Sequence, residues 1–143
     1  MKVRDILDEK GRQVVTTAPD QSIREAARMF VHHGLGAMPV VEDGELRGMI
    51  SERDALRVAM HGSGSWESTR VAAAMAEELF VVTEDDDLDY LMDVITVNRI
   101  RHLPVVDGNE LRGLVSIGDA LKAARGDDSG DRTFRRYFRG RFS

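Results

Sequence analysis

The chain contains the same segment twice. Residues 16–56 and 81–121 align at a constant offset of 65 without a gap, and they are identical at 12 of 41 positions. Ordinary residue usage gives only about two or three identities by chance over such a length. Each copy of a short repeat exposes an apolar face that the other copy can cover. The duplication therefore predicts a pseudo-symmetric pair with a groove between the copies.

Local patterns predict the order β-α-β-β-α for each copy. In the first copy Ser22-x-x-Glu25 has the form of a capping box, and apolar residues follow at helical spacing up to Gly34. An Asp43-Gly44 turn then separates two short strands. The predicted strands span 14–16, 38–41 and 46–51, with a second helix over 52–60. The second copy repeats them at 80–82, 103–106 and 111–116, with a helix over 117–125.

The resulting fold class is α+β, with two tandem β-α-β-β-α units packed with pseudo-twofold symmetry. The predicted divisions are unit 1 over 1–60, a surface linker over 61–70, unit 2 over 71–125 and a basic-aromatic C-terminal tail over 126–143. At 143 residues and 42% hydrophobic, the chain can bury one sizeable core. We therefore expect one compact module.

Composition excludes several classes of protein. The chain has no cysteine, so disulfides, thiolate metal sites and thiol catalysis are excluded. The sequence contains neither an apolar run of membrane-spanning length nor a secretory signal pattern, which leads us to expect a cytoplasmic protein. The net charge is −5, yet residues 131–143 carry five arginines against one aspartate. The tail is therefore basic and the body acidic.

Ser51-x-x-Asp54 and Ser116-x-x-Asp119 both lie where a strand gives way to a helix. Such a corner places free backbone N–H groups and the positive end of the helix dipole beside an acceptor carboxylate. It suits a ribose phosphate, because the carboxylate can accept hydrogen bonds from vicinal hydroxyls. The same spacing is also a capping-box variant that needs no ligand, and the two roles are compatible.

Two segments of the chain resemble a pair of CBS domains. They are Met38-Pro39-Val40-Val41-x4-Leu46-x-Gly48-Met49-Ile50-Ser51-x2-Asp54 and Leu103-Pro104-Val105-Val106-x4-Leu111-x-Gly113-Leu114-Val115-Ser116-x2-Asp119. The resemblance runs from Val3 to Arg125. It implies a Bateman-type module, in which two units pack through their sheets and leave two clefts. In that family the clefts often bind adenine nucleotides and sometimes S-adenosylmethionine.

The resemblance also implies which residues contact the ligand. For the cleft of Asp119 these are Thr17, Ala18, Ile23, Leu35, Gly36, Ser116 and Gly118. For the cleft of Asp54 they are Val82, Thr83, Leu88, Ile100, Ser51 and Arg53. Arg101 and His102 precede the second Leu-Pro where the first copy has Gly36 and Ala37, and basic residues there meet phosphates in the gamma subunit of AMP-activated kinase. The two clefts are thus expected to differ, with cations in the second copy.

The remaining motifs give weaker signals. No histidine and carboxylate set has zinc or iron spacing, and no nucleophile triad or Walker loop is present, so we expect neither a metal, a cofactor nor an enzyme. The tail interleaves arginines with Phe134, Tyr137 and Phe138. Such a segment can dock on the body or a second subunit, contact nucleic acid, or lie on an anionic membrane.

The sequence predicts a stand-alone regulatory module that binds AMP, ADP, ATP or S-adenosylmethionine between its repeats and modulates an unknown partner protein. Helices after Ser51 and Ser116 are expected to expose Leu56, Val58, Met60, Ala120, Leu121 and Ala123, which favours a homodimer. The alternatives are a ligand-free structural interaction module and a nucleic-acid-binding protein that acts through the tail.

Overall fold

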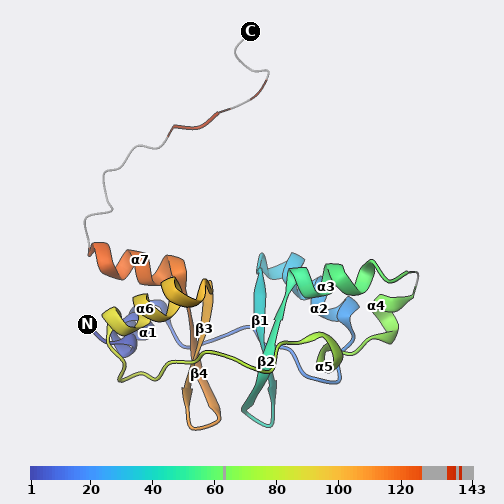
Figure 1. The fold of residues 1–143 in the computed structure, drawn as a ribbon, viewed down its shortest axis with the longest axis horizontal. Helices are drawn as coiled ribbons and strands as arrows, with labels where there is room; N and C mark the ends of the chain where they lie inside the picture. The colour runs from blue at the N-terminus through green and yellow to red at the C-terminus, as the bar shows by residue number, and fades with distance from the viewer. Residues whose placement is uncertain (63, 127–134, 138, 140–143) are drawn as a thin grey trace.

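The computed structural model describes residues 1–62, 64–126, 135–137 and 139, in which the two copies form two adjacent halves (Figure 1). Each half contains a β-hairpin and two helices, as predicted. The first half consists of α2 (Ile23–His33), β1 (Ala37–Glu42), β2 (Glu45–Ser51) and α3 (Glu52–Ala59). The second consists of α6 (Leu88–Asn98), β3 (His102–Asp107), β4 (Glu110–Ser116) and α7 (Ile117–Arg125). Three further helices are α1 (Val3–Lys10), α4 (Ser65–Ser68) and α5 (Val71–Ala74).

The four strands form one antiparallel sheet in the order β1-β2-β4-β3. Pairing is equivalent in the two hairpins, with Met38 opposite Ile50 and Leu103 opposite Val115. The hairpins join at their turn ends, where Glu45 pairs with Glu110. The seam between the halves of the sheet is therefore narrow.

The predicted leading strands over 14–16 and 80–82 are reduced to single parallel bridges. Thr17 bridges to Val40, and Val82 bridges to Val105. In the first copy the chain turns immediately afterwards, because the Gln21 N–H donates to the carbonyl of Ala18 at 3.2 Å. Each leading segment therefore adds one residue to the sheet edge.

Each half has its own apolar core between the hairpin and its helices. The first core is formed by Ile23, Ala26, Phe30, Met38, Val40, Ile50, Ala55, Val58 and Val71. The second is formed by Val3, Ile6, Leu7, Val82, Leu91, Val94, Ile95, Leu103, Val105, Val115 and Ala120. Val58 and Ala120 are thus buried, and the expectation that they are exposed is wrong. They face inward because each lies on the same helical face as the other core residues of its helix.

The segment that precedes each copy packs on the other copy. Helix α1 precedes the first copy, yet it supplies core residues to the second half, whereas Val71 of α5 belongs to the first core. The backbone contacts are equivalent. The N–H of Val3 donates to the Asp86 carbonyl at 2.9 Å, and the N–H of Val71 donates to the Gln21 carbonyl at 2.8 Å. The two halves therefore exchange their leading segments.

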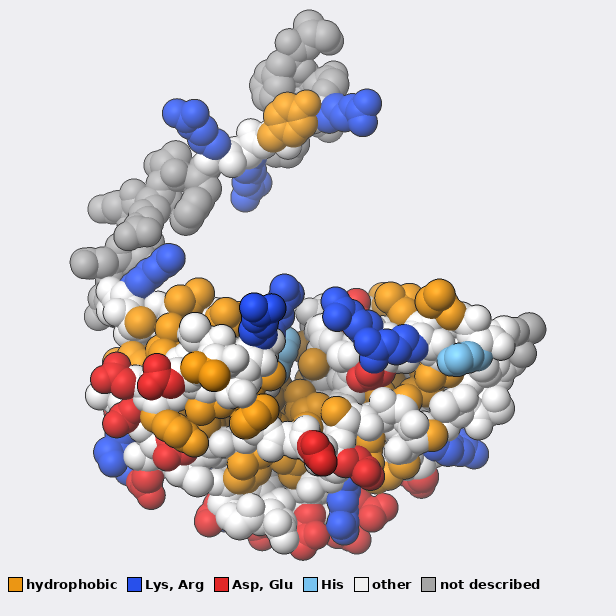
Figure 2. Space-filling model, in the orientation of Figure 1, with side chains coloured by type: hydrophobic (Ala, Val, Ile, Leu, Met, Phe, Trp, Pro, Cys, Tyr) orange, Lys and Arg blue, Asp and Glu red, His pale blue; other side chains and the backbone are white. Residues whose placement is uncertain are grey.

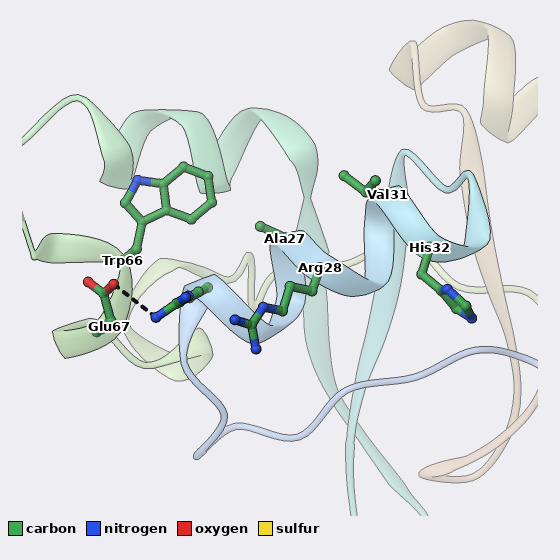
Figure 3. Close-up of a pocket in the computed structure, with 7 residues that line it drawn as sticks. Ala27, Arg28, Val31, His32, Trp66 and Glu67 are labelled. Atoms are coloured by element: carbon green, nitrogen blue, oxygen red, sulfur yellow. Dashed lines mark hydrogen bonds and ion pairs between the residues drawn. The ribbon is translucent and has the colours of Figure 1, made fainter.

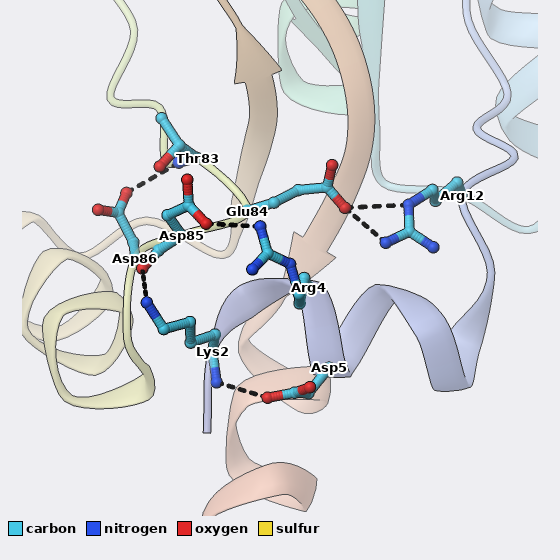
Figure 4. A network of polar contacts seen from close by, with 8 residues as sticks. All are labelled: Lys2, Arg4, Asp5, Arg12, Thr83, Glu84, Asp85 and Asp86. Atoms are coloured by element: carbon cyan, nitrogen blue, oxygen red, sulfur yellow. Dashed lines mark hydrogen bonds and ion pairs between the residues drawn. The ribbon is translucent and has the colours of Figure 1, made fainter.

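Polar contacts reinforce this exchange (Figure 4). They join α1 and the residues on either side of it to the acidic segment 84–87. Arg4 pairs with Asp85, and Arg12, which follows α1, pairs with Glu84. The Lys2 ammonium donates to the Asp85 carbonyl at 3.2 Å, as the Arg70 guanidinium does to the equivalent Asp20 carbonyl. The N-terminal helix is thus fixed to the second half by both apolar and charged contacts.

Helix α2 begins and ends where predicted. Ser22 caps it by accepting a hydrogen bond from the Glu25 N–H at 3.1 Å, and Gly34 ends it in the left-handed conformation. The reciprocal half of the predicted capping box does not form, because the Glu25 carboxylate pairs with Arg28 at 2.7 Å. One cap hydrogen bond and the glycine define this helix.

The predicted linker over 61–70 is partly folded. It contains α4, whose Trp66 packs half-buried against the first core. In the tail, the described residues Arg135, Arg136, Tyr137 and Arg139 are exposed. Phe134, Phe138 and most of the basic-aromatic pattern lie outside the described residues, so the three readings of the tail stay predictions.

Candidate functional site

The first strand-to-helix corner joins β2 to α3. Ser51 and Asp54 form a complete capping box there. The Ser51 hydroxyl accepts from the Asp54 N–H at 3.2 Å, and the Asp54 carboxylate accepts from the Ser51 N–H at 2.9 Å. Arg57 lies 3.5 Å from the other carboxylate oxygen. The capping role is therefore present in the structure, and Asp54 keeps spare acceptor capacity, since a carboxylate has about four lone-pair sites.

The second corner, between β4 and α7, has the same capping box and one additional cation. The Asp119 carboxylate accepts from the Ser116 N–H at 2.8 Å. The Lys10 ammonium also donates to Asp119 at 2.6 Å and to the Leu114 carbonyl at 2.8 Å. Lys10 is at the end of α1, so the exchanged N-terminal helix brings this charge to the corner.

The electrostatics of the second corner follow from this cluster. Partial burial raises the pKa of Asp119. However, the hydrogen bonds from Lys10 and Ser116, together with the Lys10 charge, outweigh it and hold the pKa below its ordinary value. Burial lowers the pKa of His102, and the charges of Lys10 and Arg101 lower it further. The charge of Asp119 acts in the opposite direction and raises it, but by less. The lowered pKa favours the neutral form of His102, so Arg101 is the main cation expected ahead of Leu103.

Thr17 and Ala18 line a cavity of about 400 Å³ on the first half. Its other lining residues are Thr16, Gln21, Glu25, Met29 and Val41. Thr17 is 6% exposed, and its hydroxyl has no hydrogen-bond partner among the described residues. A buried hydroxyl without a partner costs about 1–3 kcal/mol. Thr17 therefore lines this cavity with a buried hydroxyl that lacks a partner among the described residues.

Asp119 lines a different cavity, of about 140 Å³, between α1 and α7. Lys10 and Lys122 lie on it, together with Met1, Ile6, Glu9, Ala123 and Gly126. The structure thus brings Asp119, Ser116 and Gly118 together at one corner, and Thr17 and Ala18 together at another cavity. The cavities at Thr17 and at Asp119 have no lining residue in common.

The other predicted ligand contacts differ in accessibility. Ile23 and Val82 are 0% and 1% exposed inside the two cores, so a ligand reaches them only if the core rearranges. Leu35, Leu88 and Ile100 are half-buried at the margins of the cores. The surface residues are Gly36, Arg53, Thr83, Arg101 and Gly118. Figure 2 shows Lys and Arg side chains on both sides of the hollow between the halves, where a phosphate would meet positive potential.

Sequence reasoning did not identify Lys10 as a neighbour of Asp119. Lys10 precedes the aligned repeat, and only the exchange of leading segments places it on Asp119. In the part of the chain that the structure describes, no group of three or more His, Asp or Glu side chains could hold a metal ion. None of the described helices is long and apolar enough to cross a membrane.

Comparison with known proteins gives consistent matches. The family model described as "CBS domain" matches residues 3–61 and 71–126. CBS domain-containing protein YhcV of Bacillus subtilis is 39% identical over 115 residues, covering 80% of this chain and 81% of that protein. A CBS-domain containing protein of Agrobacterium tumefaciens has a solved structure that is 39% identical. Its TM-score is 0.76, with 86% of this chain and 98% of that chain covered.

Two more distant structures contain ligands. CBSX2 was solved in complex with AMP; it is 23% identical with a TM-score of 0.73, covering 87% of this chain and 96% of that chain. The pair of protein MJ0100 was solved with 5′-methylthioadenosine and S-adenosylmethionine. It is 24% identical with a TM-score of 0.74, covering 87% of this chain and 96% of that chain. At these identities the likeness shows the fold.

Proposed function

The chain belongs to the CBS domain family, and from this premise we propose that it is a regulatory module that binds an adenosine-containing ligand and modulates a partner protein. The ligand classes we propose are AMP, ADP or ATP, with S-adenosylmethionine as a further candidate. The AMP and S-adenosylmethionine complexes of the more distant pairs support this proposal. The role we assign is regulatory rather than enzymatic.

The observation that carries the proposal is the unsatisfied hydroxyl of Thr17. Thr17 lines a cavity of about 400 Å³, within the range of small-molecule sites, and its hydroxyl is buried beside that cavity. A ligand nitrogen or hydroxyl at this cavity would give the Thr17 hydroxyl its missing partner. The equivalent position in the second copy is Val82, which has no hydroxyl to satisfy. The two copies therefore offer different environments to a ligand.

The test is Thr17→Val, which removes the hydroxyl and keeps a branched side chain. Val82 at the equivalent position of the second copy shows that valine fits there. We expect the free protein to become more stable, because a buried unsatisfied group is removed, and the affinity for the adenosine ligand to fall. Thermal unfolding with and without AMP, ADP, ATP and S-adenosylmethionine measures both, since a ligand of the folded state raises the melting temperature. Higher stability with unchanged affinity would separate Thr17 from the ligand. No shift with any of the four compounds would favour a ligand-free interaction module.

A second candidate function is nucleic-acid binding through the tail. Arg135, Arg136 and Arg139 are exposed beside an exposed Tyr137, a combination that can contact phosphates and stack on bases. Such binding weakens steeply with salt. A variant truncated at about Asp128 should then lose DNA or RNA binding while keeping its response to nucleotides.

We also propose that the protein is a homodimer. Leu56 on α3, Met60 directly after it, and Ile117 and Leu121 on α7 remain exposed in the single chain. Figure 2 shows hydrophobic side chains along the upper rim over these two helices. Apolar surface of this kind favours association.

A further inference from the structure

Lys10 reaches the second corner in a position that leaves both a donor and an acceptor for a further group. Its ammonium donates to Oδ2 of Asp119 at 2.6 Å and to the Leu114 carbonyl at 2.8 Å. An ammonium has three N–H donors, so one remains for another acceptor. The Ser116 N–H also donates to Oδ2, at 2.8 Å. Oδ1 of Asp119 therefore keeps its capacity to accept, and a pair of vicinal hydroxyls can bind there while Lys10 stays in place.

The corner as a whole carries a surplus of positive charge. Asp119 balances Lys10, and their side chains are 24% and 36% exposed. Arg101 is exposed and forms no ion pair with a described residue. Burial is the main cause of the lowered pKa of His102, and the charges of Lys10 and Arg101 lower it further, so these groups lie close enough to interact. A ligand at this corner therefore meets two cations and one carboxylate.

The first corner has no lysine beside its carboxylate. The offset of 68 that relates Val3 to Val71 places Glu78 where the N-terminal segment has Lys10. Asp54 is instead paired with Arg57 of its own helix, at 3.5 Å. The lysine is thus a difference between the two corners, and it comes from outside the aligned repeat.

A larger cationic groove lies elsewhere on the molecule. It has a volume of about 630 Å³ and is bordered by Arg24 and Arg28 of α2 and by Trp66 of α4 (Figure 3). Neither Asp54 nor Asp119 lines it. The cations of this groove therefore do not meet a ribose that is held at either corner.

Resting on the proposed nucleotide-binding function, we propose that Lys10 makes the Asp119 corner selective for the charge on the 5′ carbon of the ribose, so that it binds adenosine 5′-phosphates and rejects S-adenosylmethionine. The 2′ and 3′ hydroxyls donate to Asp119 and must stay free, which leaves the 5′ substituent as the charged group. A phosphate there gains the third N–H of Lys10 and the charge of Arg101. The sulfonium of S-adenosylmethionine puts a positive charge on the same carbon, and both cations repel it.

The test compares four compounds that share adenosine and differ at the 5′ carbon. They are AMP, adenosine, 5′-methylthioadenosine and S-adenosylmethionine, and calorimetry at a pH above the second phosphate pKa of about 6 keeps AMP doubly charged. Wild type should bind AMP more tightly than adenosine, and 5′-methylthioadenosine more tightly than S-adenosylmethionine. We expect Lys10→Gln to reduce the ratio of AMP to adenosine affinity at least about fivefold, because a charged hydrogen bond is lost. It should also reduce the discrimination against S-adenosylmethionine.

The ratio of two ligands on one variant cancels any change in the stability of the fold. Lys122→Gln is the matched control, since Lys122 lies on the same cavity as Lys10. Its ammonium is 3.9 Å from Glu9 and its side chain is 70% exposed, so the ratio should stay at the wild-type value. Lys10→Arg keeps the charge and should retain most of the preference for AMP.

Two results with Lys10→Gln would overturn the proposal. Equal losses for AMP and adenosine would mean that Lys10 only positions Asp119, and tighter binding of both would mean that Lys10 blocks the corner. A wild type that binds S-adenosylmethionine as tightly as AMP would also overturn it, yet would leave the proposed function standing. Binding of none of the four compounds would overturn both.

Discussion

The two equivalent aspartates have different neighbours. The Asp119 carboxylate lies 2.6 Å from the Lys10 ammonium. The Asp54 carboxylate lies 3.5 Å from the Arg57 guanidinium, and the Arg57 side chain is 67% exposed. The difference arises because α1 is longer than its counterpart α5, with eight residues against four. The additional turn brings Lys10 to the second corner. The two corners thus share a sequence motif but differ in the charge beside the carboxylate.

We expect Lys10→Met to lower the free energy of unfolding by about 1 kcal/mol at pH 7, because both partners of the pair keep contact with water. The pKa of Asp119 is depressed, so its ionised form stabilises the fold above its unfolded pKa of about 3.9. This contribution is lost as pH falls through the folded pKa. Urea unfolding at several pH values should show that the free energies of unfolding of the wild type and the variant converge below about pH 4. Arg57→Met is the matched control and should change stability little; an equal loss there would remove the special role of Lys10.

The phosphate contact predicted from the sequence depends on Arg101. Burial lowers the pKa of His102, which favours its neutral form. We therefore expect Arg101→Ala to weaken AMP binding by about 1–2 kcal/mol while leaving adenosine binding unchanged. His102→Gln should leave AMP affinity near pH 7.5 as it is, and the wild type should gain affinity as His102 becomes protonated at lower pH. Calorimetry with AMP and adenosine distinguishes these cases. Equal losses for both ligands in Arg101→Ala would make Arg101 a structural residue.

Among the elements, the hairpins and the helices that follow them could be predicted from the sequence. The Asp43-Gly44 turn, Gly34 and the two Ser-x-x-Asp boxes are local signals, and the structure has each of them. Helix α1 and the exchange of leading segments could not be predicted. Val3 corresponds to Val71 at an offset of 68 rather than 65, so a gap-free alignment does not include them. The location of Lys10 depends on this exchange, and so does the part of the lowered pKa of His102 that comes from the Lys10 charge rather than from burial. Neither could be predicted from the sequence.

The exchange explains the glycine in each copy of the strand motif. A Cβ on Gly48 would lie 2.6 Å from the Ala76 carbonyl oxygen, and one on Gly113 would lie 2.8 Å from a Leu7 methyl group. Both are too close, but a leucine side chain can move more readily than a backbone carbonyl. We expect Gly48→Ala to lower the free energy of unfolding by about 1–3 kcal/mol and Gly113→Ala by less. Denaturant titration of the two variants gives the comparison, and the opposite ranking would mean that the α5 segment yields more easily than Leu7.

At the scale of the whole molecule, each half is incomplete without a segment from before the other copy. Val3, Ile6 and Leu7 are at most 5% exposed in the second core, although they lie within the first seven residues. Terminal residues are usually tolerant of change unless they are buried. The N-terminal helix is therefore part of the second half, and it couples the halves in addition to the narrow seam of the sheet.

Leu7→Ala tests this coupling, because it removes a fully buried side chain that packs above Gly113. We expect a loss of about 3 kcal/mol in the free energy of unfolding, the usual cost of truncating a buried leucine. Glu9→Ala on the same helix is the control; its 3.9 Å pair with Lys122 is exposed and should contribute little. Since the halves share segments, circular dichroism and Trp66 fluorescence, which reports the first half, should show one coincident transition in the variant. A Trp66 transition that stays at the wild-type midpoint while the remaining structure melts earlier would show that the halves unfold independently.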